Sequence, residues 1–94
     1  MDEGEFQWND LKAAQNLTKH RVSFEAAKVV FKDPFAIEYV DDREDYGETR
    51  LIIIALVDDR LLVVAYAMRD EAFRIISARA AEPFERREYH EQNT

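Results

Sequence analysis

The sequence contains no cysteine, two histidines, two glycines and two prolines. Without cysteine the chain forms neither disulfides nor thiolate zinc sites. With only His20 and His90 available, we expect no metal and no other cofactor. The N-terminus lacks a basic segment followed by an apolar stretch, so no secretion signal is predicted. Because the longest apolar run, Leu51–Val57, is too short to cross a bilayer, we expect a cytoplasmic protein that makes no membrane contact.

The composition is that of one globular unit with segregated charges. The 94 residues are 47% hydrophobic and carry neither a repeat nor a linker, so we expect residues 1–94 to form a single domain. The formal net charge of −7 predicts repulsion from nucleic acid on average. All four lysines lie at or before Lys32, and six of the nine arginines lie at or after Arg60. Five acidic residues fall within residues 41–48, so an RNA-directed role requires a local basic patch away from that loop.

Helical patterns occur in the N-terminal third and at the C-terminus. Asn9 or Asp10 is suited to capping a first helix, and Ser23 to capping a second, which Asp33-Pro34 ends. The expected elements are a short edge strand at 6–8 and helices at 10–20, 24–32 and 82–91.

The middle of the sequence is rich in Ile, Val and Leu, and it predicts strands at 35–40, 50–57, 60–68 and 72–79. The turns Asp58-Asp59 and Asp70-Glu71 are too short for a crossover, so neighbouring strands pair antiparallel. The predicted fold is α+β, with two N-terminal helices packed on one face of a four-stranded antiparallel meander and a C-terminal helix after it. The two central strands are apolar on both faces, so the second face requires a cover, either the last helix or a partner.

Two segments resemble one known family. Residues 6–24, FQWNDLKAAQNLTKHRVSF, are similar to the pattern F-x-W-D-x-x-K-x-x-x-N-x-x-K-H-G-V-S-F that opens BrnT toxins. The segment from Arg69 to Tyr89 contains R-x-x-x-x-R-I-I-S-A-R followed by E-R-R-x-Y, which resembles the closing run of the family. The resemblance implies a RelE-like fold and the toxin of a type II toxin–antitoxin system. It further implies a metal-independent endoribonuclease that inhibits translation, in which the 2′-hydroxyl of RNA attacks the adjacent phosphate.

Three arginines of the second segment suit that chemistry. Arginine holds phosphate through two parallel hydrogen bonds and stabilises charge that develops in the transition state. We expect Arg69, Arg74 and Arg79 to converge on one concave catalytic patch with Trp8 near its rim. Alanine at position 74 or 79 is expected to remove toxicity while the melting temperature stays nearly unchanged. The alternative is that these arginines form only salt bridges, with Asp70, Glu71 and Glu85.

Four further side chains are expected to contact RNA: Trp8, Lys19, His20 and Arg86. An aromatic ring beside a basic cluster can stack an unpaired base, but Trp8 can equally anchor the first helix against the sheet, and both interpretations stay open. His20 is a candidate general base, because an imidazole side chain suits that role. Its alternative role is to close the first helix by bonding the last carbonyls. Arg86 either touches phosphate or belongs to a solvated helix face.

The resemblance also implies a partner, a cognate ribbon-helix-helix antitoxin of the BrnA kind, bound in a heterotetramer. The acidic residues 41–48 are suited to steering a basic antitoxin. Some positions depart from the family pattern: Arg21 replaces a glycine expected in the left-handed conformation, and Ala80 and Phe84 replace residues that are often basic. A second hypothesis is therefore a weak or inactive toxin-like binding module that acts as partner and co-repressor of the antitoxin. A third is a homodimer formed through the open sheet face.

Overall fold

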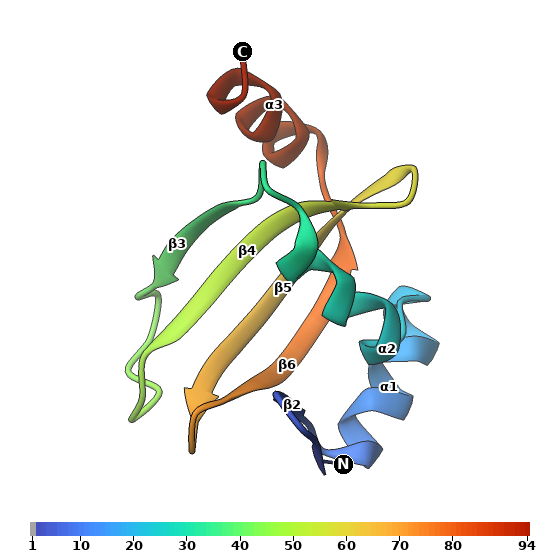
Figure 1. The fold of residues 1–94 in the computed structure, drawn as a ribbon, viewed down its shortest axis with the longest axis vertical. Coiled ribbons are helices and arrows are strands. Elements are labelled where there is room, and N and C mark those ends of the chain that lie inside the picture. Colours follow the sequence, from blue (N-terminus) through green and yellow to red (C-terminus); the bar gives the residue numbers. More distant parts are fainter. Residues whose placement is uncertain (1) are drawn as a thin grey trace.

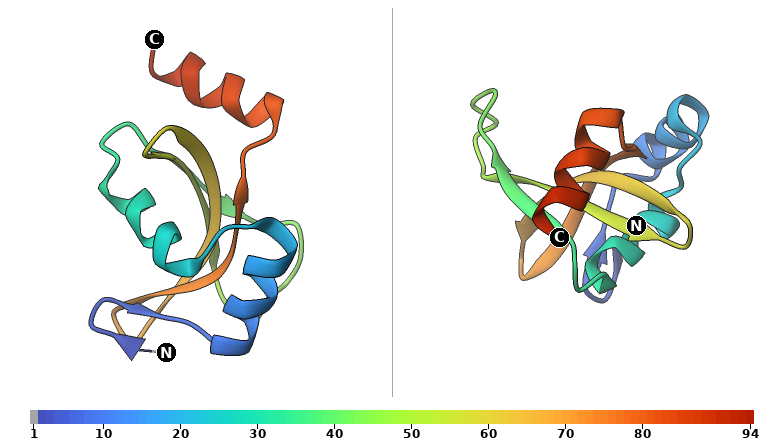
Figure 2. Two further views of the ribbon diagram at one scale, coloured as in Figure 1. Left: turned by 90° about the vertical axis from the view of Figure 1, so that its right-hand side faces the viewer. Right: turned by 90° about the horizontal axis from the view of Figure 1, so that it is seen from above.

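The computed structural model describes residues 2–94, whose elements form one layered unit (Figure 1). The helices are α1 (Asp10–His20), α2 (Phe24–Ala27), the 3-10 helix η1 (Lys28–Lys32), which continues α2, and α3 (Pro83–Gln92). The strands are β1 (Asp2–Glu3), β2 (Phe6–Gln7), β3 (Ile37–Asp41), β4 (Arg50–Val57), β5 (Arg60–Arg69) and β6 (Ala72–Ala80). The left view in Figure 2 shows α3 standing apart from α1 and α2, at another end of the sheet.

The sheet has six strands in the order β1-β2-β6-β5-β4-β3. Its larger part, β3 to β6, is the predicted antiparallel meander. The short edge strand expected at 6–8 is present as β2, but the predicted fold of a purely antiparallel, four-stranded sheet is wrong. β2 pairs with β6 in parallel, with Phe6 opposite Phe73 and Gln7 opposite Arg74, and β1 adds a further antiparallel strand outside β2. Strands of two residues carry too little hydrophobic pattern to reveal their partners.

The helices begin and end near their predicted residues. α1 has the expected bounds, and Asn9 caps it by accepting a hydrogen bond from the amide of Lys12 at 3.0 Å. Arg21 ends α1 in the left-handed conformation expected at this position, with a φ of 60°. Ser23 caps α2 by accepting from the amide of Ala26 at 3.0 Å, but the helix expected over 24–32 divides into α2 and η1.

Asn16 joins α1 to the edge of β6. Its amide nitrogen donates to the carbonyls of Val22 and Ala78, each at 2.9 Å, and its Oδ1 accepts from the amide of Ala78 at 3.1 Å. The side chain therefore makes with Ala78 both bonds that another strand would make. Because β2 pairs with β6 only at Phe73 and Arg74, Asn16 satisfies backbone groups on the part of the edge that β2 leaves open.

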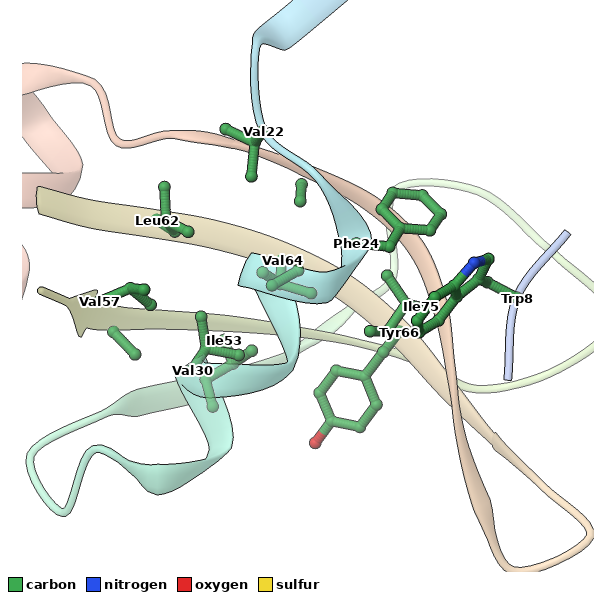
Figure 3. Close-up of a cluster of buried hydrophobic side chains, with 13 residues drawn as sticks. Trp8, Val22, Phe24, Val30, Ile53, Val57, Leu62, Val64, Tyr66 and Ile75 are labelled. Atoms are coloured by element: carbon green, nitrogen blue, oxygen red, sulfur yellow. The ribbon is translucent and has the colours of Figure 1, made fainter. Parts of the chain in front are cut away.

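Hydrophobic side chains form a cluster on each face of the sheet. The larger cluster lies on the side of α2 and η1 and is drawn in Figure 3; its members include Trp8, Phe24, Val30, Val64 and Ile75. The smaller cluster joins strand residues such as Ile54 and Leu61 to Ala81 and Tyr89. Ile52 and Val63 on that second face are only 6% and 5% exposed. Tyr89 of α3 therefore covers part of the second face, and the last helix was one of the two covers expected from the sequence.

Candidate functional site

A β-bulge brings the predicted arginines to one face of the sheet. In a regular strand Arg74 and Arg79, five residues apart, would point to opposite faces. In β6, however, Tyr66 pairs with Ile75 and Ala65 pairs with Ser77, which leaves Ile76 as an extra residue. Both arginines consequently lie on the face opposite the larger hydrophobic cluster. Arg69 shares this face, because it lies two residues along β5 from Ala67, the partner of Arg74.

Arg69 and Arg74 lie near a common carboxylate, Glu48. Nε and Nη2 of Arg69 donate to the two carboxylate oxygens of Glu48 at 2.9 and 2.6 Å. The hydrogen bonds from Arg69 lower the pKa of Glu48, and the charges of Arg50 and Arg74 lower it further. Glu48 is thus ionised and surrounded by guanidinium groups, in the way that a bound phosphate oxygen would be.

Arg50 is a member of this group that the sequence did not single out. Arg50 is the first residue of β4, pairs with Asp41 of β3 and lies on the same face of the sheet as Arg74. Its guanidinium lies over the ring of Tyr46, 4.0 Å from the centroid. Within residues 2–94, its Nε is a buried side-chain atom that has no hydrogen-bond partner. The sequence could have indicated Arg50, because it begins an apolar strand two residues after Glu48, where a charged side chain can stay at the margin of the sheet.

Of the three predicted arginines, Arg74 makes the weakest contacts with other side chains and is the easiest for a ligand to engage. Its Nη1 makes a long hydrogen bond of 3.4 Å to the amide oxygen of Gln7, and it forms no ion pair in the described part of the chain. Gln7 reaches it because β2 pairs with β6 in parallel at this position. A neutral partner at this distance is displaced by an anion at little cost.

Arg79 lies apart from Glu48 and the three arginines around it, which are Arg50, Arg69 and Arg74. On β5, the strand partners of Arg74 and Arg79 are Ala67 and Val63. These two residues are four positions apart, which corresponds to about 14 Å along the strand. Its Nη1 and Nη2 donate to the two oxygens of Glu85 at 2.7 and 2.9 Å, so this arginine forms the salt bridge that the sequence left as an alternative. Burial by itself raises the pKa of Glu85, but the hydrogen bonds from Arg79 and from the amide of Glu82 outweigh it and the net pKa is lowered.

The expectation that alanine at position 79 leaves stability unchanged is corrected by this salt bridge. The Glu85 side chain is 3% exposed, and removing Arg79 would leave its charge buried without a partner. Arg74 is therefore the better position for a functional test.

Trp8 does not stand at the rim of the arginine patch. It is 4% exposed and packs edge-on against Phe24 with the ring centroids 5.9 Å apart, in the cluster on the other face of the sheet. The structure supports the anchoring role for Trp8, because its buried ring offers no face on which a base could stack.

Lys19 and His20 occupy the last turn of α1 and lie beside β6. They line a groove of about 260 Å³ together with Lys12 and, from β6, Ile76 and Ser77. Arg86 lies elsewhere, on the exposed side of α3. Of the four residues expected to contact RNA, two are thus brought next to the strand that carries Arg74 and Arg79. Lys12 and Ser77 were missed, although Lys12 and Lys19 are seven residues apart and share a helix face.

The described residues give no sign of two other kinds of site. Within residues 2–94, no three side chains of His, Cys, Asp or Glu are grouped as metal ligands. Among the helices of the same part of the chain, none is both long and apolar enough to cross a membrane.

Fold and site together define a small α+β domain whose mixed sheet carries arginines on one face. A family model described as the ribonuclease toxin BrnT of type II toxin–antitoxin systems matches residues 8–85, and the chain belongs to this family. No curated protein matches the chain. Family membership makes the chain a toxin of the ribonuclease class, with RNA as substrate and an antitoxin as partner. Arg86 lies just beyond the matched residues, whereas Arg69, Arg74 and Arg79 lie within them.

Proposed function

We propose that the chain is a metal-independent endoribonuclease in which arginines of the bulged sheet face stabilise the reacting phosphate. The 2′-oxygen attacks the adjacent phosphorus, the bond to the 5′-oxygen of the next nucleotide breaks, and the products are a 2′,3′-cyclic phosphate and a 5′-hydroxyl. The 2′-hydroxyl loses its proton and the leaving 5′-oxygen gains one. The observation that carries the proposal is the bulge at Ile76, which supports a shared role for Arg74 and Arg79 by aligning them on one face.

Each arginine has a separate task in this proposal. Arg74 grips a non-bridging oxygen of the scissile phosphate, since its present bond to Gln7 is weak. Arg69 exchanges its bidentate pair with Glu48 for the same phosphate, and its side chain is exposed enough for substrate to reach it. Arg79, whose position on the strand lies about 14 Å from that of Arg74, holds another phosphate of the same RNA strand. Glu48 is a poor candidate for the general base, because its lowered pKa makes it a weak proton acceptor.

The test of this mechanism is cleavage of RNA by the purified toxin in the presence of a chelator. The expected result is cleavage that persists in EDTA and yields 2′,3′-cyclic phosphate ends. Loss of activity in EDTA that returns with a divalent metal, or 5′-phosphate products, would contradict the mechanism.

The competing proposal is a weak or inactive toxin-like module that serves as partner and co-repressor of the antitoxin. It is favoured by the carboxylates that already occupy Arg69 and Arg79 and by the net charge of −7. Growth arrest on expression without antitoxin, relieved by co-expression of the antitoxin, supports the enzyme. Normal growth together with tight antitoxin binding supports the module.

We further propose where the antitoxin binds. A groove of about 320 Å³ lies between β3 and α3, with Arg79 and Glu85 among its lining residues. Val40 and Phe84 on its sides are 55% and 54% exposed, and Asp42 adds acidic charge. These features suit a basic, amphipathic segment of a BrnA-like ribbon-helix-helix antitoxin, assembled as a heterotetramer.

The antitoxin proposal is tested by Val40→Asp combined with Phe84→Asp. The control, Leu11→Asp combined with Leu17→Asp, adds the same two charges at residues of α1 that are 68% and 49% exposed. Calorimetric titration with the antitoxin is expected to show weaker binding only for the groove variant. Equal affinities of the groove and control variants would refute this location, and a homodimer that the groove variant dissociates would indicate self-association instead.

A further inference from the structure

The groove between α1 and β6 is a cationic site next to the arginine face. Lys12, Asn16 and Lys19 recur at helical spacing on one side of α1. Asn16 fixes that side against β6 through its hydrogen bonds to Ala78, so the two lysines are held at the edge of the strand. His20 and the hydroxyl of Ser77 also line the groove.

The charge of this groove is opposite to that of the whole chain. None of the residues that line it is acidic, although the net charge of the chain is −7. Lys12 and Lys19 are exposed and form no salt bridge within the described residues. Lysines that are concentrated in a groove without acidic partners attract a polyanion. Because they form no salt bridge among residues 2–94, the fold does not depend on their charge.

The groove continues onto the arginine face at Ser77. Ser77 pairs with Ala65, which packs against the smaller hydrophobic cluster, so its side chain lies on the same face as Arg74 and Arg79. Ser77 lies between these two arginines along β6. Because β2 pairs only with Phe73 and Arg74, a ligand can pass from the sheet face to α1 across the later part of the strand.

We infer that this groove is a phosphate-binding subsite for the single-stranded RNA that flanks the cleaved bond. Lys12 and Lys19 neutralise backbone phosphates, Ser77 donates a hydrogen bond, and the RNA crosses β6 near the bulge. The inference rests on the proposed function for the identity of the substrate, but these residues bind and do not take part in the chemistry.

The experiment measures binding separately from cleavage. The probe is a short single-stranded RNA with 2′-O-methyl groups, which cannot be cleaved by 2′-hydroxyl attack, and its affinity for the full chain is followed by fluorescence anisotropy over a range of salt concentrations. The test variant is Lys12→Ala with Lys19→Ala. The control, Lys32→Ala with Arg60→Ala, removes the same charge from exposed positions on η1 and β5.

The groove variant is expected to bind roughly tenfold more weakly than the control and to lower the slope of log affinity against log salt by about 1.4, since each single-strand phosphate contact contributes about 0.7. Equal affinities and slopes for the two variants would overturn the inference. An equal loss of affinity for polyglutamate would also overturn it, because the groove would then be a general polyanion surface. If the parent chain binds the probe through the groove but cleaves no natural RNA, the proposed function fails and the binding site stands.

Discussion

Replacing Asn16 with alanine removes the side chain that fastens α1 to β6. Three hydrogen bonds disappear, and the amide of Ala78 and the carbonyls of Ala78 and Val22 lose their partner. Each neutral hydrogen bond contributes about 0.5–1.5 kcal/mol, and buried groups left unpaired add to the loss, while alanine regains about 0.5 kcal/mol of helix propensity. The expected loss is about 3 kcal/mol from a total stability of roughly 5–14 kcal/mol.

Thermal unfolding followed by circular dichroism measures this loss. For a domain of this size, about 3 kcal/mol lowers the melting temperature by roughly 12–24 °C. The control is Gln15→Ala, a neighbour on the exposed side of α1, which is expected to melt within a few degrees of the parent. If Asn16→Ala melts as close to the parent as the control does, the bonds to β6 contribute little and the account of the sheet edge is wrong.

Three further predictions concern stability. Tyr89→Phe removes a hydrogen bond of 2.7 Å to the carboxylate of Asp33 and is expected to cost about 1.5–3 kcal/mol in urea unfolding; an unchanged midpoint would contradict the assigned contact. Arg21→Gly relieves a left-handed residue and is expected to gain about 0.5–1 kcal/mol in the same assay, whereas a loss would show that the arginine side chain compensates for its backbone. Hydrogen bonds from Arg43 lower the pKa of Asp41 to about 2, below its value in the unfolded chain, so this carboxylate stabilises the fold above about pH 4 and the benefit is lost as pH falls toward 2. Because Arg43 is open to solvent, the effect is about 1 kcal/mol, and it should be missing from the acid titration of Asp41→Asn; identical acid profiles for parent and variant would contradict it.

Much of the fold could be predicted because its signals are local. Asn9 and Ser23 identify the starts of α1 and α2, and the pairs Asp58-Asp59 and Asp70-Glu71 identify the hairpins that make β4, β5 and β6 antiparallel. Asp70 and Glu71 both have positive φ, as the tightest hairpin turns require, so acidic residues take this conformation where glycine is usual.

The candidate site was harder to predict because it depends on pairing between distant segments. The parallel contact of β2 with β6 joins residues far apart in the chain, and no pattern in two residues predicts it. The bulge at Ile76 is equally invisible in the alternation of side chains, yet it decides which face Arg79 occupies. Arg50 was overlooked because its relation to Arg69 and Arg74 exists only through Glu48, in the loop before β4.

The central claim is that arginines on the bulged face of the sheet stabilise the phosphate during RNA cleavage. Its most direct test is the single-turnover cleavage rate of Arg74→Ala, compared with Arg60→Ala, which removes an exposed arginine at the start of β5. The account predicts that Arg74→Ala lowers the rate by about 10²–10³-fold, that Arg74→Lys restores only part of it, and that Arg60→Ala cleaves like the parent. Arg74→Ala should melt close to the parent, because Arg74 forms no ion pair in the described part of the chain. A folded Arg74→Ala variant that cleaves RNA at the parental rate would contradict the account.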